Sequence, residues 1–148
     1  MSEFEVKERL AHSVFVEMMR EAGYQVRKID YEGALQELVN VKDEGYKLYI
    51  ADIKEHNHDF LLLDGNSPLM LQVYFSEKKV NPKDYDFPEY LGGVLLIFIT
   101  PFEPFFQIGV VRDFCNEGVL YPLSENPLFV VPSEIVNKYG TVIAKRLK

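Results

Sequence analysis

Three polar side chains stand within two apolar segments that are close together in the sequence. Asp59 opens the first segment, and Gln72 and Tyr74 lie in the second, after a turn sequence at 65–68. A carboxylate such as Asp59 is the kind of oxygen ligand that hard divalent cations prefer. Gln72 could offer a metal a neutral carbonyl oxygen, whereas Tyr74 carries no charge near neutral pH. Ordinary structural roles, a strand start for Asp59 and a solvent-facing position for Gln72, fit the same pattern.

Two histidines next to Asp59 suggest a different chemistry. His56 and His58 would face the same way on one strand, which can suit Zn²⁺, although no cysteine or third histidine stands near them in the sequence. The single cysteine, Cys115, has no identifiable base beside it, so a cysteine nucleophile is not expected.

The elements that would position these residues follow from hydrophobic periodicity. A stripe that contains Leu10, Val14 and Met18 predicts a long amphipathic N-terminal helix, closed by Gly23. Residues 59–64 and 69–75 are predicted to form a hairpin. The apolar run at 94–99 predicts a central strand that is covered on both faces. Further strands are expected at 25–31, 46–50 and 105–111, with short candidates at 119–121 and 128–131. Short helices are expected at 34–39 and at 134–139, where Ser133 would be the cap. Residues 80–91 are expected to form a loop.

Together these elements predict a single domain, residues 1–148, of the α/β (α+β) class. Its mixed β-sheet would carry the long N-terminal helix on one face. We expect Leu10, Val14 and Met18 to pack against the hairpin, at Leu62, Leu71 and Val73, and against the strand at 94–99.

This arrangement resembles the PD-(D/E)XK (restriction-endonuclease-like) nuclease superfamily. In that family a helix ending near a Gly-aromatic pair, here Gly23-Tyr24, often carries a glutamate. An acid then opens one hairpin strand, and an acid-x-lysine triplet lies in the next. Asp59 matches the first acid, Gln72 stands at the second acid and Tyr74 at the lysine. The helix position falls near His12, with Glu8 one turn earlier on the same edge of the stripe.

The resemblance implies carboxylates around Mg²⁺ and a lysine that positions or activates a water. In this chain Asp59 keeps that chemistry and is the expected metal ligand, whereas Gln72 and Tyr74 do not keep it, so the motif is degenerate. A second carboxylate could come from Glu8 or Glu17, and a displaced cation from Lys78 or Lys79. No cofactor is expected, except Mg²⁺ if catalysis survives.

The whole chain narrows the partners. Its formal net charge of −7 disfavours a nucleic-acid partner, and no apolar run approaches the ~20 residues of a membrane span. The acidic N-terminus and single cysteine favour a cytoplasmic location.

Three functions remain open. The first is a non-catalytic binding or structural protein on a nuclease-like fold with an eroded site. The second is an active divalent-metal-dependent nuclease with a rearranged site. The third is an unrelated small α/β interaction module, which could form a homodimer. Its surface, unless these side chains are core, would use the aromatic residues Phe102, Phe105, Phe106, Tyr121 and Phe129.

Overall fold

The computed structural model describes residues 2–29, 58–64 and 67–148. The described strands form one six-stranded sheet in the order β1-β2-β3-β4-β5-β6. Neighbouring strands are antiparallel except β3 and β4, which are parallel. The sheet is therefore mixed, and the predicted α+β class is confirmed. Its strands are β1 (Gln25–Lys28), β2 (Asp59–Asp64), β3 (Ser67–Phe75), β4 (Leu95–Ile99), β5 (Phe106–Val110) and β6 (Tyr121–Pro122).

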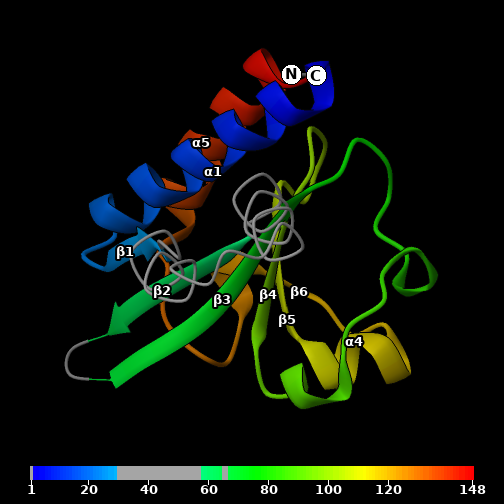
Figure 1. Ribbon diagram of the computed structural model, residues 1–148. Helices are drawn as coiled ribbons and strands as arrows, with labels where there is room; N and C mark the ends of the chain where they lie inside the picture. The colour runs from blue at the N-terminus through cyan, green and yellow to red at the C-terminus, as the bar shows by residue number, and fades with distance from the viewer. Residues whose placement is uncertain (1, 30–57, 65–66) are drawn as a thin grey trace, which may run out of the picture.

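Helices cover both faces of this sheet (Figure 1). On one face α1 (Glu3–Glu21) and α5 (Ser133–Arg146) lie side by side and run in opposite directions. On the other face lie α4 (Val111–Glu117) and the connection from β3 to β4, which contains the short 3₁₀ helices η1 (Pro82–Asp84) and η2 (Glu89–Leu91). A third 3₁₀ helix, η3 (Leu123–Glu125), follows β6.

The two faces of the sheet bury different side chains, because successive strand residues point to opposite faces. Val73 on β3 and Ile97 on β4 belong to the core beneath α1 and α5. Leu96 and Phe98 instead pack against α4, through Val111 and Phe114. All five residues of β4 are buried, as predicted for a central strand.

Helix α1 begins and ends as its sequence predicts. The Ser2 side chain accepts a hydrogen bond from the backbone N–H of Glu5, and Gly23 takes the left-handed conformation (φ 96°) that favours glycine after a helix. The helix packs on the sheet through Ala11, His12, Phe15, Met18 and Met19.

The prediction that Leu10 is buried was wrong, since 47% of Leu10 is exposed. Residues four apart on an α-helix advance by about 40° around its axis, so a row such as Val6, Leu10, Val14 and Met18 drifts off one face. Met18 is fully buried and Val14 partly so, as expected.

Several strand boundaries also differ from prediction. β3 begins at Ser67 rather than Leu69, and β1 is described as far as Lys28. The strand expected at 105–111 ends at Val110, where α4 begins without a side-chain cap. The expected helix at 34–39 and strand at 46–50 lie outside the described residues.

The C-terminal part was predicted least well. Residues 128–131 form no strand, because the Asn126 carboxamide accepts the backbone N–H groups of Leu128 and Phe129. α5 runs to Arg146, far past the predicted end at 139, and its N-cap is Pro132 rather than Ser133. Gly140 lies inside α5 where Phe105 packs closely, since a Cβ atom at 140 would lie 2.5 Å from the Phe105 ring.

The aromatic residues considered for an interaction surface divide between core and surface. Phe106 and Phe129 are buried and Phe105 packs against the core, whereas Phe102 and Tyr121 are exposed. Within the described ranges, no helix combines the length and the apolar character needed to cross a membrane.

Candidate functional site

The hairpin brings the three predicted motif residues together. Asp59 on β2 lies directly opposite Gln72 on β3. The Gln72 amide donates a hydrogen bond of 2.8 Å to the Asp59 carboxylate, and the Tyr74 hydroxyl donates one of 2.8 Å to the Gln72 carbonyl oxygen. A row of hydrogen bonds therefore links the positions that the nuclease resemblance assigns to two acids and a lysine.

Tyr74 is held in this row by other rings. It stacks on Phe98 with ring centroids 5.8 Å apart and on His58 with centroids 4.2 Å apart. Burial raises the pKa of the Tyr74 phenol well above its usual range, and the negative charges of Asp59 and Glu8 add to this effect. Tyr74 is thus a neutral hydrogen-bond donor and cannot replace a lysine cation or act as a base near pH 7.

The row lies on the face of the sheet that points away from α1. Gln72 and Tyr74 pair in register with Leu96 and Phe98, which belong to the core beneath α4. His12 points from α1 to the opposite face, where it lies edge-on to Phe60. Asp59 and Gln72 therefore meet on one face of the sheet, and His12, at the helix position of the resemblance, lies on the other.

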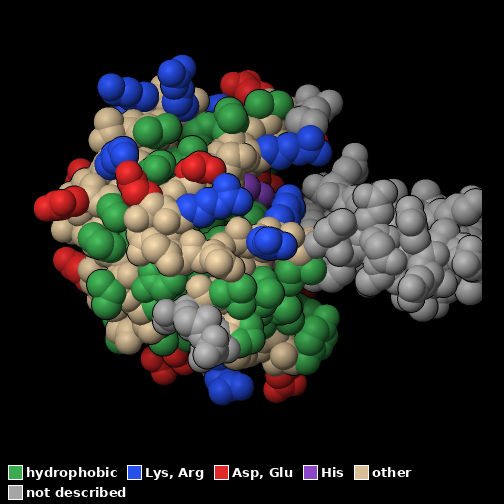
Figure 2. Space-filling view, turned by 90° about the vertical axis from the view of Figure 1, so that its left-hand side faces the viewer, with side chains coloured by type: hydrophobic (Ala, Val, Ile, Leu, Met, Phe, Trp, Pro, Cys, Tyr) green, Lys and Arg blue, Asp and Glu red, His purple; other side chains and the backbone are tan. Residues whose placement is uncertain are grey.

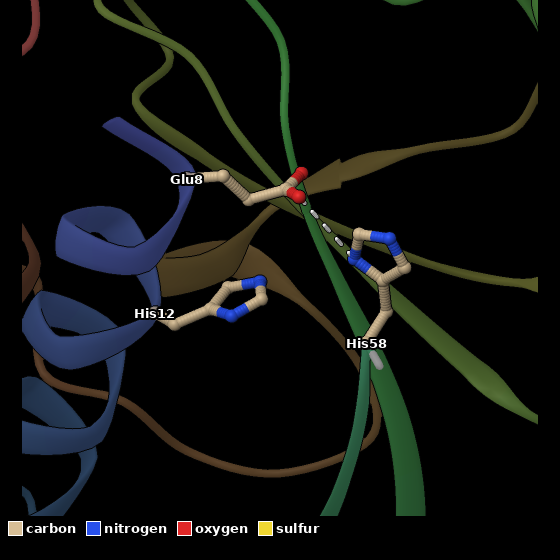
Figure 3. A group of neighbouring side chains, drawn as sticks. All are labelled: Glu8, His12 and His58. Atoms are coloured by element: carbon tan, nitrogen blue, oxygen red, sulfur yellow. Dashed lines mark ion pairs between the residues drawn. The ribbon is translucent and has the colours of Figure 1, made fainter. Parts of the chain in front are cut away.

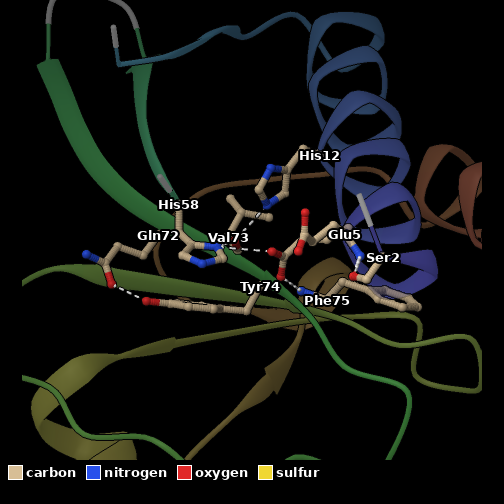
Figure 4. A network of polar contacts seen from close by, with 9 residues as sticks. Ser2, Glu5, His12, His58, Gln72, Val73, Tyr74 and Phe75 are labelled. Carbon is tan, nitrogen blue, oxygen red and sulfur yellow. Dashed lines mark hydrogen bonds and ion pairs between the residues drawn. The ribbon is translucent and has the colours of Figure 1, made fainter. Parts of the chain in front are cut away.

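A second polar group forms where the described part of β2 begins. The backbone N–H of Val73 donates to the His58 carbonyl, and the Val73 carbonyl accepts from His58 Nδ1 at 3.0 Å and from His12 Nε2 at 2.9 Å. Two residues further along β3, the backbone N–H of Phe75 lies 3.4 Å from Glu8 Oε2. Side chains thus make hydrogen bonds to backbone groups of β3 beyond Gln72 (Figure 4).

We call Glu8, His12 and His58 the α1-edge cluster. One ligand atom from each residue lies within 4.8 Å of the other two, and His58 Nδ1 is 3.9 Å from Glu8 Oε1 (Figure 3). Glu8 and His12 are four residues apart and so share one side of α1. His58 is the residue just before β2, and its side chain points towards Glu8 and His12. Asp59 belongs to no such group of three among the described residues.

Burial controls the protonation of this cluster. His12 is 6% exposed, and burial lowers the pKa of its imidazole to about 4. Its Nε2–H points to a carbonyl, so Nδ1 carries the lone pair, and Nδ1 has no hydrogen-bond partner in the part of the chain that the structure describes. Burial also lowers the pKa of His58, while the nearby Glu8 carboxylate opposes that shift. Both imidazoles are therefore neutral near pH 7, the form that binds metals.

The other candidate residues lie elsewhere. Glu17 is exposed and pairs with Arg20, Lys78 pairs with Asp84 at 3.5 Å, and Lys79 is exposed. Cys115 is an exposed free thiol. His56, the other half of the predicted histidine pair, lies outside the described residues.

Sequence reasoning named all three residues of the α1-edge cluster but did not bring them together. It paired His58 with His56 instead of with Glu8 and His12. It also left out Lys28 on β1, whose pKa is lowered by burial and by Arg9 and raised by Glu8. Figure 2 shows a histidine side chain at the surface among lysine and arginine side chains. The four-residue spacing of Glu8 and His12 was the signal in the sequence.

Comparison of the chain with protein-family models, curated proteins and solved structures finds no match. The resemblance to PD-(D/E)XK nucleases stays a prediction from the residues quoted above.

Proposed function

We propose that this protein is a non-catalytic binding protein built on a nuclease-like scaffold, in which the nuclease site has been replaced by a structural hydrogen-bond row. The observation that supports this best is the row itself, from Tyr74 through Gln72 to Asp59. The polar groups at the motif positions bind one another.

The electrostatics of phosphodiester cleavage point the same way. Cleavage needs metal ions or cations that offset the charge developing on the phosphoryl oxygens. Gln72 brings no charge and Tyr74 is neutral, so Asp59 supplies the one carboxylate of the row. Loss of one electrostatic stabiliser costs on the order of 10²–10³ in rate, and two motif positions have lost theirs.

The test is a nuclease assay with single- and double-stranded DNA and RNA in the presence of Mg²⁺ or Mn²⁺. We expect the parent protein to cleave no faster than an Asp59→Ala variant and a protein-free control. Metal-dependent cleavage by the parent that Asp59→Ala abolishes would overturn the proposal.

A rearranged nuclease site is the second candidate, and the position of Glu8 favours it. The Glu8 carboxylate reaches the backbone N–H of Phe75 on β3, the strand that carries Gln72 and Tyr74, so it could supply the missing acid. Cleavage that is lost in Glu8→Gln and kept in Glu17→Gln would support this candidate. Glu17 is a matched control, because it is an exposed glutamate on the same helix.

A further inference from the structure

The α1-edge cluster has the composition of a transition-metal site. Two imidazoles and one carboxylate, as in Glu8, His12 and His58, form the donor set of His₂Glu zinc centres and of 2-His-1-carboxylate iron centres. Hard cations such as Mg²⁺ prefer sites made of oxygens.

The donor atoms lie close together but wider apart than around a bound ion, since they are all within 4.8 Å of one another. A cation with bonds of about 2.1 Å places its ligand atoms roughly 3.0–3.4 Å apart, from right-angled to tetrahedral geometry. His12 Nε2 and His58 Nδ1 lie 2.9 Å and 3.0 Å from the same atom, the Val73 carbonyl oxygen. Glu8 Oε1 lies 3.9 Å from His58 Nδ1, so a shift of about half an ångström in this long side chain would bring that pair to the spacing of two metal ligands.

Two of the three ligands are held in place before any ion binds. His12 is buried between α1 and the sheet, with its ring against Phe60. His58 is stacked on Tyr74. Because each ring already points its inner nitrogen at the Val73 carbonyl, little side-chain ordering is required on binding.

We propose that Glu8, His12 and His58 bind one divalent transition-metal ion, with the Val73 carbonyl oxygen available as a fourth ligand. On binding, the proton on each inner nitrogen moves to the outer nitrogen of the same ring, so the imidazoles stay neutral; for His12 this leaves a buried N–H at Nδ1 with no acceptor among the described residues, which lowers the affinity. The metal site is independent of the proposed function, because a metal can bind here without any cleavage of nucleic acid.

Two basic side chains near the cluster, Lys28 and Arg9, oppose the binding of a metal ion. Both cations are close enough to interact electrostatically, Lys28 with the cluster and Arg9 with Lys28. Arg9 is exposed, so water screens its charge, whereas Lys28 is close enough to lower the pKa of both imidazoles and would weaken the binding of a cation.

The test is calorimetric titration of the full-length, tag-free, chelator-treated protein with Zn²⁺, repeated with Co²⁺ and Mg²⁺. We expect saturation at one Zn²⁺ per chain, a Co²⁺ absorption spectrum that shows nitrogen coordination, and no Mg²⁺ binding under the same conditions. Glu8→Gln and His58→Asn should each weaken Zn²⁺ binding by at least about tenfold.

Matched controls separate this site from metal binding elsewhere on the chain. Glu17→Gln changes an exposed glutamate on α1, and His56→Asn changes the neighbouring histidine; both should bind Zn²⁺ as the parent does. Circular dichroism confirms that each variant is folded. Because His12 is buried, His12→Gln is informative only where its spectrum matches the parent, and the conclusion rests on Glu8 and His58.

Three results would overturn the proposal. The first is a parent protein that binds no Zn²⁺. The second is tight binding that persists in folded Glu8→Gln and His58→Asn. The third is binding that His56→Asn abolishes, which would assign the ion to the 56–58 histidine pair. Since the readout is metal binding, a negative nuclease assay leaves this test unaffected.

Discussion

Acidification should destabilise the metal-free protein through His12, and the size of the effect follows from its pKa. The imidazole has a pKa of about 4 in the folded protein and of 6.5 as its ordinary value. The cause is burial, and a proton added at Nδ1 would meet no acceptor among the described residues. Lys28 and His58 lower the pKa further, while the Val73 carbonyl raises it.

The sign of the effect follows from proton linkage. Below pH 6.5 the unfolded chain binds a proton at His12, whereas the folded protein does not until the pH is near 4. The contribution of neutral His12 to the unfolding free energy is therefore fully present above pH 6.5 and is lost towards pH 4. Between pH 7.5 and pH 5.5 this linkage removes about 1.3 kcal/mol of the unfolding free energy. The full shift of 2.5 pKa units corresponds to about 3.4 kcal/mol.

The measurement is urea unfolding in the presence of a chelator at several pH values within that range, where most carboxylates stay ionised. The chain contains no tryptophan, so far-ultraviolet circular dichroism is the suitable signal. His12→Gln provides the comparison, because its side chain can still donate a hydrogen bond but does not titrate. We expect the parent to lose about 1.3 kcal/mol more than this variant on acidification. Equal losses, or a parent that gains stability, would refute the reasoning.

Three further changes test the packing and the hydrogen-bond row by chemical denaturation. Leu96→Ala should cost about 2–4 kcal/mol, because Leu96 is fully buried on the α4 face; a loss below about 1 kcal/mol would contradict that packing. Tyr74→Phe should cost about 0.5–1.5 kcal/mol, because it removes the hydrogen bond to Gln72 and keeps the stacked rings; no measurable loss would mean that the row contributes nothing. Gly109→Ala should lower the unfolding free energy by more than about 1 kcal/mol, because its Cβ would lie 2.7 Å from the Val119 carbonyl oxygen. No loss of stability would show that β5 and the segment at Val119 move apart readily.

Local sequence patterns predicted the parts of the fold that depend on local interactions. The helix start at Ser2 and its end at Gly23 follow from side-chain and backbone chemistry within a few residues. The hairpin and the nearness of Asp59 to Gln72 were predicted, and Asp59 lies directly opposite Gln72. The expected turn at 65–68 would have paired Asp59 with Tyr74, but β3 begins at Ser67.

The errors arose where contacts between distant residues decide the structure. Leu10 is exposed because the rotation of α1 on the sheet is set by its partners, and an apolar residue at the margin of the stripe can face either way. α4 follows β5 directly and has no side-chain cap, so no start signal precedes it. The run at 128–131 has strand-like composition, but hydrogen bonds to Asn126 occupy its backbone.

The candidate site was predictable in part for the same reason. Gln72 and Tyr74 are two residues apart on one strand, so their shared face could be predicted. Which face of the sheet α1 covers could not be predicted from the sequence. Because α1 covers the face opposite to the row, Glu8 and His12 do not join Asp59. The contact of His58 with Glu8 of α1 depends on how α1 is placed beside the start of β2. This placement is a property of the tertiary structure.

The most direct test of both proposals is a crystal structure of the protein grown with Zn²⁺, with diffraction data collected on both sides of the zinc absorption edge. We expect an anomalous peak about 2.1 Å from nitrogens of His12 and His58. We expect no such peak between Asp59 and Gln72, whose hydrogen bond of 2.8 Å should be intact. A metal bound at Asp59, with the row to Tyr74 broken and no anomalous peak at His12 and His58, would contradict both the inert hydrogen-bond row and the metal site on α1.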